Sequence, residues 1–337
     1  MTDPSEHPEG LPVVHVSQIE SEAQPRRWLI EGLWGPQSVG FLAGHPKAYK
    51  SWLGLEMAVS VASATPCLGT FPVREPGRVL IYLAEDSLEA LRGRVAAITR
   101  YRGLELADID LHVIKTPELR LDLPEQRRRL EATVRALRPR LLLLDPLVRL
   151  HRLDENRASD VSGLLSHLRS LQRAFELSVI LVHHTRKNEV ASGPDGQGLR
   201  GSGDLWAWTD SSLFLRRTRG RLRLSMEHRA AAAPEPVWLR LADEDEDCIH
   251  LEVICAEVEE EEKRSLAGAI VGLLAGGATL TRTELREKLR VQNSRLGEAL
   301  VDLEQQGRIA RLASGWRLLD AHQADGPEGE TPSKGAA

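Results

Sequence analysis

The 337-residue sequence predicts an α/β fold with a mainly parallel sheet, followed by a small C-terminal α/β domain. Between residues 38 and 184, short and strongly apolar segments alternate with segments of helical length, which is typical of a parallel sheet covered by helices on both faces. After residue 264, three segments of helical length precede a pair of short strands. This order of elements is typical of a winged helix, so we expect the C-terminal domain to be winged-helix-like.

The apolar runs predict the parallel strands at residues 38–44, 77–86, 111–115, 140–146 and 178–184. Helices are predicted between them at residues 51–64, 88–101, 124–139 and 158–177. Beyond Asp204 the runs are shorter and joined by turns, which predicts an antiparallel extension of the sheet. The C-terminal helices are predicted at residues 265–277, 281–289 and 293–307, with the strand pair within 308–319. Ligands of such sheets bind at the carboxyl ends of the parallel strands, so the loops there form the candidate site.

Changes of composition divide the chain into five parts. Residues 1–20 and 321–337 are polar and bear Pro or Gly, which predicts a flexible N-terminal arm and a disordered tail. The large α/β domain is predicted over residues 21–256 and the winged-helix-like domain over residues 264–320. The acidic run 257–263 between them is interpreted as a solvated linker or a helix start, with an acidic docking surface as the alternative.

Cysteine usage and hydropathy exclude several classes of protein. The three cysteines, Cys67, Cys248 and Cys255, form no C-x-x-C pair, so neither a disulfide framework nor a structural zinc site is expected. No stretch approaches about 18 uncharged apolar residues, so no membrane contact is predicted. The N-terminal segment lacks the basic start and apolar run of a secretion signal, and we expect a cytoplasmic protein.

The charge of the chain is unevenly distributed. The net charge is −5, which by itself disfavours sequence-independent nucleic-acid binding. Eleven acidic residues lie between Asp243 and Glu262, however, and the rest of the chain has a net charge of +6. Residues 264–320 contain nine Lys or Arg against six Asp or Glu, so this domain is mildly basic. DNA therefore remains a candidate partner.

The loop after the first predicted strand matches the phosphate-binding pattern G-x-x-x-x-G-K-[ST] at all but one position. Such a loop presents backbone N–H groups to phosphate at a helix N-terminus, so Lys50 is predicted to reach the β- and γ-phosphates of ATP and Ser51 to ligate Mg²⁺. Tyr49 replaces the second glycine, so its side chain would have to point away from the nucleotide. The alternative is a loop with a chance Lys-Ser pair. The predicted nucleotide-binding residues are Gly44, His45, Pro46, Lys47, Ala48, Tyr49, Lys50, Ser51 and Trp52.

Polar residues end three other predicted strands. Asp145 follows four leucines, as a Walker B carboxylate that holds Mg²⁺ does, although a helix N-cap is the alternative. Glu85 is the candidate general base for the attacking water, while the adjacent Asp86 with Ser87 could instead cap the next helix. His184 ends the fifth strand beside His183, and a sensor of the γ-phosphate is favoured over a metal site because no third ligand stands at useful spacing.

The segments GHPKAYKS, IYLAEDS, LLLLDP, VILVHHTRK and GLRGSGDLWAWTD occur in an order and spacing that resembles one known family. They are similar to the RecA-fold P-loop ATPases related to RepA-type hexameric plasmid replicative helicases, the AAA_25 family. The resemblance covers roughly residues 20–230, and HHTRK followed by RGSG is its most specific part. It implies a RecA-like ATPase core that assembles into a ring, commonly a hexamer, with nucleotide held between subunits.

The resemblance also implies roles for individual residues. Lys50 and Ser51 take the P-loop positions, Asp145 the magnesium position, Glu85 the position of the base and His184 that of the sensor. An arginine finger acting across the subunit interface is expected downstream of the histidines, with solvated arginines at strand ends as the alternative. The candidates for this finger are Arg200, Arg216 and Arg217.

Two functions of different classes follow from these observations. The first is an ATP-hydrolysing ATPase that acts on DNA, with Arg290, Asn293 and Arg295 at the start of the third C-terminal helix as the candidate contacts. The second is a nucleotide-dependent regulator or scaffold that recruits a protein partner through residues 264–320. A small-molecule phosphotransferase is disfavoured, because the sequence shows no acceptor site.

Overall fold

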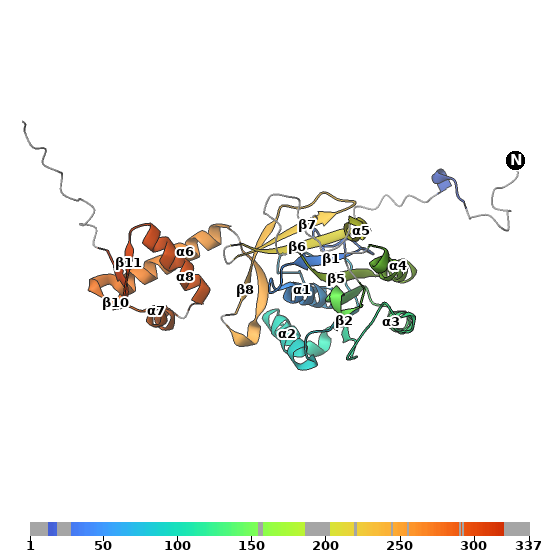
Figure 1. Cartoon of the computed structure of the whole chain (residues 1–337), viewed down its shortest axis with the longest axis horizontal. Helices are drawn as coiled ribbons and strands as arrows, with labels where there is room; N and C mark the ends of the chain where they lie inside the picture. The colour runs from blue at the N-terminus through green and yellow to red at the C-terminus, as the bar shows by residue number, and fades with distance from the viewer. Residues whose placement is uncertain are drawn as a thin grey trace, which may run out of the picture.

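The computed structural model describes residues 13–18, 28–153, 158–185, 203–218, 221–243, 245–254, 256–289, 291 and 293–319 (Figure 1). Within these residues the chain forms a large α/β body with a nine-stranded sheet, and a second unit with its own three-stranded sheet. The predicted α/β fold with a mainly parallel sheet and a small C-terminal unit is confirmed. Figure 1 shows the two units as separate groups of elements, joined where the large sheet ends and the next helix begins.

The strands of the large sheet lie in the spatial order β3-β2-β4-β5-β1-β6-β7-β8-β9. Those from β3 to β6 in this order are parallel, and β7, β8 and β9 continue the sheet in antiparallel fashion. Their bounds are β1 (Val39–Gly44), β2 (Val79–Leu83), β3 (Leu111–Val113), β4 (Leu141–Asp145), β5 (Ser178–His184), β6 (Ser211–Thr218), β7 (Arg221–His228), β8 (Val237–Ala242) and β9 (His250–Ile254).

Helices cover both faces of the parallel part. On one face α1 and α2 bury apolar residues such as Leu53 and Ile98, and on the other face α3 and α4 bury residues such as Val134 and Leu168. The two buried layers explain why the central strands are apolar without alternation. The helices of this body are α1 (Lys50–Ser63), α2 (Leu88–Tyr101), α3 (Pro124–Leu137), α4 (Ala158–Phe175) and α5 (Gly203–Trp208). Short 3₁₀ turns occur at η2 (Val16–Gln18), η3 (Leu106–Asp108), η4 (Leu147–Arg149) and η6 (Glu246–Cys248).

Strand β6 differs from the sequence prediction. The sequence predicts an antiparallel extension beyond Asp204, but β6 pairs in parallel with β1, and in the described part of this sheet the antiparallel strands are β7 to β9. The backbones of β1 and β6 are in close contact, since a Cβ atom on Gly40 would lie 1.7 Å from the carbonyl oxygen of Ser211 and one on Gly44 would lie 2.2 Å from that of Leu215. Glycine at these positions is therefore required for β6 to lie beside β1.

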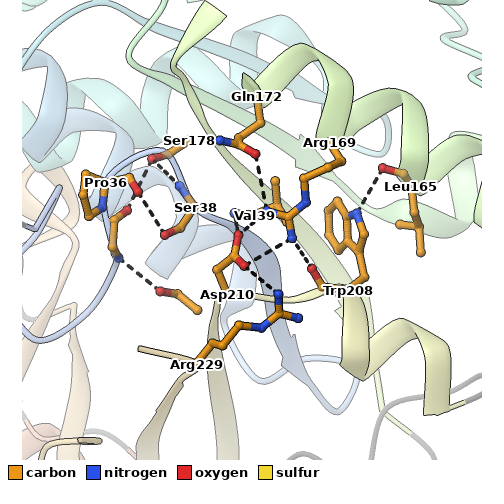
Figure 2. Close-up of polar contacts among 12 residues, drawn as sticks. Pro36, Ser38, Val39, Leu165, Arg169, Gln172, Ser178, Trp208, Asp210 and Arg229 are labelled. Carbon is orange, nitrogen blue, oxygen red and sulfur yellow. Dashed lines mark hydrogen bonds and ion pairs between the residues drawn. The ribbon is translucent and has the colours of Figure 1, made fainter. Parts of the chain in front are cut away.

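Asp210 fixes β6 at its start (Figure 2). Its carboxylate accepts a hydrogen bond from the backbone N–H of Val39 over 3.1 Å and forms an ion pair with Arg169 of α4. The backbone N–H of Asp210 donates in turn to the carbonyl of Val39 over 2.8 Å, and Arg229 at the end of β7 lies 3.4 Å from the same carboxylate. This network sets the register of β6 against β1 and α4.

A buried ion pair connects the last strand of the sheet to helix α1. Glu56 of α1 is 1% exposed, and its carboxylate pairs with Arg102 and accepts the N–H of Leu251 in β9 over 2.9 Å. Arg102 also donates to the hydroxyls of Ser60 and Thr65, over 2.8 Å each. Burial raises the pKa of Glu56, while the charge of Arg102 opposes that change. The ion pair therefore ties α1, α2 and β9 together.

In the described residues after β9, the C-terminal unit has three α-helices and a small antiparallel sheet of strand order β10-β12-β11, around a core that includes Ile270, Leu300 and Trp316. Residues 257–263, predicted as a linker or helix start, lie within its first helix, and β10 was not predicted. The elements are α6 (Ala256–Leu274), η7 (Ala275–Gly277), β10 (Thr279–Leu280), α7 (Arg282–Leu289), α8 (Asn293–Gln305), β11 (Ile309–Leu312) and β12 (Gly315–Leu318). Arg290, the side chains of Asn293 and Arg295, and the tail 321–337 lie outside the described residues.

Among the helices of the described residues, none is long and apolar enough to cross a membrane.

We predict that Arg102→Leu lowers the free energy of unfolding by about 3–5 kcal/mol, because it leaves the Glu56 carboxylate buried without its cation. Urea unfolding measures the change. The exposed Arg100, which pairs with Asp247, gives the matched control Arg100→Ala, and its stability should stay close to that of the parent. Adding Glu56→Gln to Arg102→Leu should recover much of the loss, and a double variant as unstable as the single one would contradict the role of the charge.

Candidate functional site

Four predicted site segments meet at one edge of the sheet. The strand register pairs Gly44 at the end of β1 with His184 at the end of β5, and Leu83 at the end of β2 with Asp145 at the end of β4. Because β2, β4, β5 and β1 are consecutive parallel neighbours, the loops that follow them lie together. The motif residues therefore gather at the carboxyl ends of the parallel strands, where the candidate site was placed.

Lys50 is the first residue of α1 and is 5% exposed. Its ammonium group donates to the carbonyl of His45 over 2.8 Å and to Nδ1 of His184 over 3.2 Å. Burial lowers the pKa of Lys50 to about 8, although the carboxylates of Asp145 and Glu85 act in the opposite direction. The structure thus holds this cation inside the loop, between the loop's own backbone and the end of β5.

Asp145 and Ser51 make up the second part of the site. Asp145 is 7% exposed, and Ser51 is near enough to its carboxylate to favour the charged form. Burial raises the pKa of Asp145 to about 6, while Ser51 and the charge of Lys50 lower it. A hydroxyl and a carboxylate that lie near each other offer the hard oxygen ligands that Mg²⁺ prefers, so the residues present fit a magnesium ion.

The backbone of Tyr49 has φ 59° and ψ 27°, which is the left-handed conformation that favours glycine. Its side chain is half-buried and packs against the core on the α1 face, and the guanidinium carbon of Arg217 lies 5.8 Å from the ring centroid. The ring therefore points toward the core and β6. This arrangement explains how a tyrosine stands at the second glycine position of the loop.

The other loop residues have different surroundings. Lys47 is exposed and also has a positive φ of 63°, whereas Ala48 is buried. Trp52 is half-buried, with the guanidinium carbon of Arg94 5.7 Å from its ring centroid. His45 contributes its backbone carbonyl to Lys50, and Pro46 is exposed.

The two carboxylates that follow β2 have different partners. Asp86 is paired with Arg94 at 2.7 Å and is 19% exposed, whereas Glu85 is paired with Arg149 at 2.9 Å and is 52% exposed. The N-cap of α2 is Ser87, whose hydroxyl accepts the N–H of Ala90, so Asp86 does not cap this helix. Glu85 is therefore the more accessible of the two to a water molecule.

Arg149 is a site residue that the sequence analysis missed. It lies in η4, four residues after Asp145, and no motif or spacing rule assigns a partner to an arginine there. Its contact with Glu85 depends on β2 and β4 being neighbours, which becomes known only once the strand order is known.

The two histidines at the end of β5 are in unlike environments. His183 is 2% exposed, and its ring centroid lies 5.5 Å from that of Phe41, so it belongs to the core. His184 is half-buried and contacts Lys50. Across the described part of the chain, no cluster of three or more His, Cys, Asp or Glu could hold a metal ion by itself.

The three candidate arginine fingers are placed only in part. Arg200 lies outside the described residues, while Arg216 and Arg217 stand at the carboxyl end of β6. Strand β6 lies on the side of β1 opposite to β5, β4 and β2. These two arginines are thus separated by the P-loop strand from Glu85 and Asp145 of the same chain.

The site combines a buried ammonium group and a buried carboxylate whose pKa values have both moved toward neutrality. An anion beside Lys50 and a cation beside Asp145 would each stabilise the charged form. Ionisable groups with shifted pKa values cluster at functional sites. The arrangement is suited to bind a polyanion together with a divalent cation, with a carboxylate available at its edge.

The chain matches the model of one protein family. The model of the AAA_25 family, described as an AAA domain, matches residues 3–190. Among solved structures, the crystal structure of the RadB recombinase is similar to the chain with a TM-score of 0.47 and 17% identity, over 65% of this chain and 92% of that one. None of the curated protein sequences is significantly similar to the chain.

We predict that Tyr49→Gly retains nucleotide binding, because glycine adopts the left-handed backbone freely and the ring points away from Lys50. Tyr49→Val, the matched variant, should weaken binding about tenfold, since a β-branched residue at positive φ costs about 1–2 kcal/mol. Titration of a fluorescent ATP analogue measures both. A complete loss of binding in Tyr49→Gly would show that the tyrosine ring itself contacts the nucleotide.

Proposed function

Because the chain belongs to the AAA_25 family of AAA domains, we propose that it binds and hydrolyses ATP and uses the reaction to act on DNA. The observation that carries this proposal is the placement of Lys50, Ser51 and Asp145 at one edge of the sheet. Glu85 follows the end of the neighbouring strand. Each of these groups has a defined task in phosphoryl transfer to water.

ATP binding would exchange the partners of Lys50. The ammonium group leaves the carbonyl of His45 and Nδ1 of His184 and contacts the β- and γ-phosphates, which stabilise its charge in the buried site. In this exchange His184 contacts the γ-phosphate, as the predicted sensor role requires. The exchange links occupancy of the loop to the end of β5.

Ser51 and Asp145 would hold a magnesium ion through their oxygen atoms. Magnesium, when bound, neutralises charge on the phosphates of the nucleotide. Ser51 need not lose its proton, because its hydroxyl can turn a lone pair toward the ion.

Hydrolysis needs a base and a compensating cation. Glu85 accepts a proton from water as the water attacks the γ-phosphate, and its exposure leaves room for that water. The negative charge that develops on the transferred group calls for an arginine. Since Arg216 and Arg217 lie across β1 from their own Glu85, they are suited to act on a neighbouring subunit, with Arg200 as a further candidate. This proposal includes assembly into a ring, a hexamer as in RepA-type helicases.

DNA is the proposed substrate on which the ATPase acts. The net charge of +6 outside the acidic stretch 243–262, and the mildly basic C-terminal unit, support contact with phosphate backbones. Duplex unwinding, as in replicative helicases, is the most specific form of this proposal.

A second function is favoured by one observation on α8. Val301 is 47% exposed on this helix, between the acidic residues Glu298 and Asp302. An apolar side chain with acidic neighbours fits a protein better than it fits DNA. In this alternative, ATP sets the assembly state and the C-terminal unit recruits a protein partner.

We predict that Glu85→Gln binds ATP like the parent but hydrolyses it on the order of 10² more slowly, because the carboxylate acts on water and not on the bound nucleotide. A steady-state phosphate-release assay together with nucleotide titration separates the two effects. Asp86→Asn is the matched control and should keep a rate close to that of the parent. Hydrolysis by Glu85→Gln at the parent rate would remove Glu85 from the reaction.

The DNA part of the proposal is tested by measuring ATP hydrolysis with and without single- and double-stranded DNA. We expect DNA to raise the rate of ATP hydrolysis severalfold, because an ATPase that acts on DNA turns over faster when DNA is bound. An unchanged rate with both forms of DNA would favour the protein-recruiting alternative. Glu85→Gln serves as the negative control in the same assay.

A further inference from the structure

In the C-terminal unit, basic residues predominate on one pair of strands and acidic residues on one helix. Its terminal hairpin, strands β11 and β12, contains Arg308 just before it and Arg311 and Arg317 within it, and no acidic residue lies between Glu304 and Asp320. Helix α8 has the opposite character, with Glu298, Asp302 and Glu304 against the single Arg295. A mildly basic average over residues 264–320 conceals this separation.

The three hairpin arginines are exposed, and none forms an ion pair with a residue in the part of the chain that the structure describes. Arg317 is paired in register with Ala310, while Arg311 faces Trp316, with its guanidinium carbon 6.0 Å from the indole centroid. The positive charges therefore occupy both faces of the hairpin. Leu312, 44% exposed, and two small residues form its tip.

The hairpin is held firmly to the rest of the unit. Ile309 and Trp316 anchor it in the core, with exposures of 1% and 8%. Gly315 follows the turn with φ 139°, and a Cβ atom there would lie 2.5 Å from the carbonyl oxygen of Leu280. The backbone of β12 is thus in close contact with β10, which presents the arginines on a fixed support.

The exposed side of α8 is poorly suited to the major groove. Leu296, Leu300 and Leu303 are buried, so the residues turned outward include Glu298, Val301 and Asp302. Carboxylates placed against phosphates repel them and release no counterions.

We propose that the β11–β12 hairpin, and not α8, is the DNA-contacting surface of the C-terminal unit, with Arg308, Arg311 and Arg317 bound to the phosphates of a duplex. This inference rests on the proposed action on DNA. It assigns the contact to a different element from the third helix, which the element order by itself would favour. Three phosphate contacts correspond to a log–log salt slope of about −3 for this surface.

The experiment is a fluorescence anisotropy titration of a labelled duplex with the full chain over a series of salt concentrations. Arg311→Ala/Arg317→Ala should lower the affinity at low salt by about tenfold or more and make the salt slope shallower by about two. The charge-preserving Arg311→Lys/Arg317→Lys should keep the parent slope, which distinguishes a lost contact from a misfolded unit. The matched control, Arg128→Ala/Arg135→Ala on the exposed side of α3, should bind like the parent.

A second double variant tests whether α8 contacts DNA. Glu298→Gln/Asp302→Asn should leave duplex affinity unchanged if this helix faces away from DNA. Tighter binding by that variant, or unchanged binding by Arg311→Ala/Arg317→Ala, would overturn the assignment to the hairpin.

Parallel ATPase assays without DNA separate this inference from the proposed function. Hydrolysis by a parent protein that binds no duplex at low salt would overturn the hairpin proposal and leave the ATPase intact, with protein recruitment as the role of the unit. Hairpin-dependent duplex binding by a parent protein that hydrolyses no ATP would support the inference and remove the ATPase from the proposed function.

Discussion

The close packing of β1 between β5 and β6 is the constraint on which the site depends. Gly40 and Gly44 bring the backbone of β1 so near to that of β6 that no side chain fits between them. Asp210 holds β6 against β1 where the two strands begin. Its carboxylate accepts the N–H of Val39 and pairs with Arg169. The P-loop therefore leaves the sheet from a strand that is held on both sides, and its position relative to His184 and Asp145 is set by backbone pairing.

A second constraint is electrostatic. Lys50 and Asp145 are both nearly inaccessible to solvent, and burial moves the pKa of each toward neutrality. Such a pair is unfavourable for the protein alone and is stabilised when ligands of opposite charge arrive. The left-handed Tyr49 has a related local cost, offset by the packing of its ring against the core and Arg217. The loop is thus arranged for a ligand and not for its own stability.

Helix α1 connects the site to the end of the large sheet. It begins with Lys50 and Ser51, and less than two turns later Glu56 contacts Arg102 and the backbone of Leu251. Strand β9 in turn ends at Ile254, close in sequence to the first residue of α6. The same helix therefore contacts the nucleotide loop at one end and the strand that leads to the C-terminal unit at its middle.

The sequence by itself determined the alternation of strands and helices, because continuous apolar runs and their flanking turn residues are local properties. It also identified Lys50, Ser51, Glu85, Asp145 and His184 as site candidates, since each follows a strand whose carboxyl end is predictable. The parallel pairing of β6, the contact of Arg149 with Glu85 and the position of Arg217 over Tyr49 were decided only by the tertiary structure. Each depends on which strands are neighbours, and that order is set by long-range backbone contacts such as those of Gly44 and Asp210, which no local pattern records.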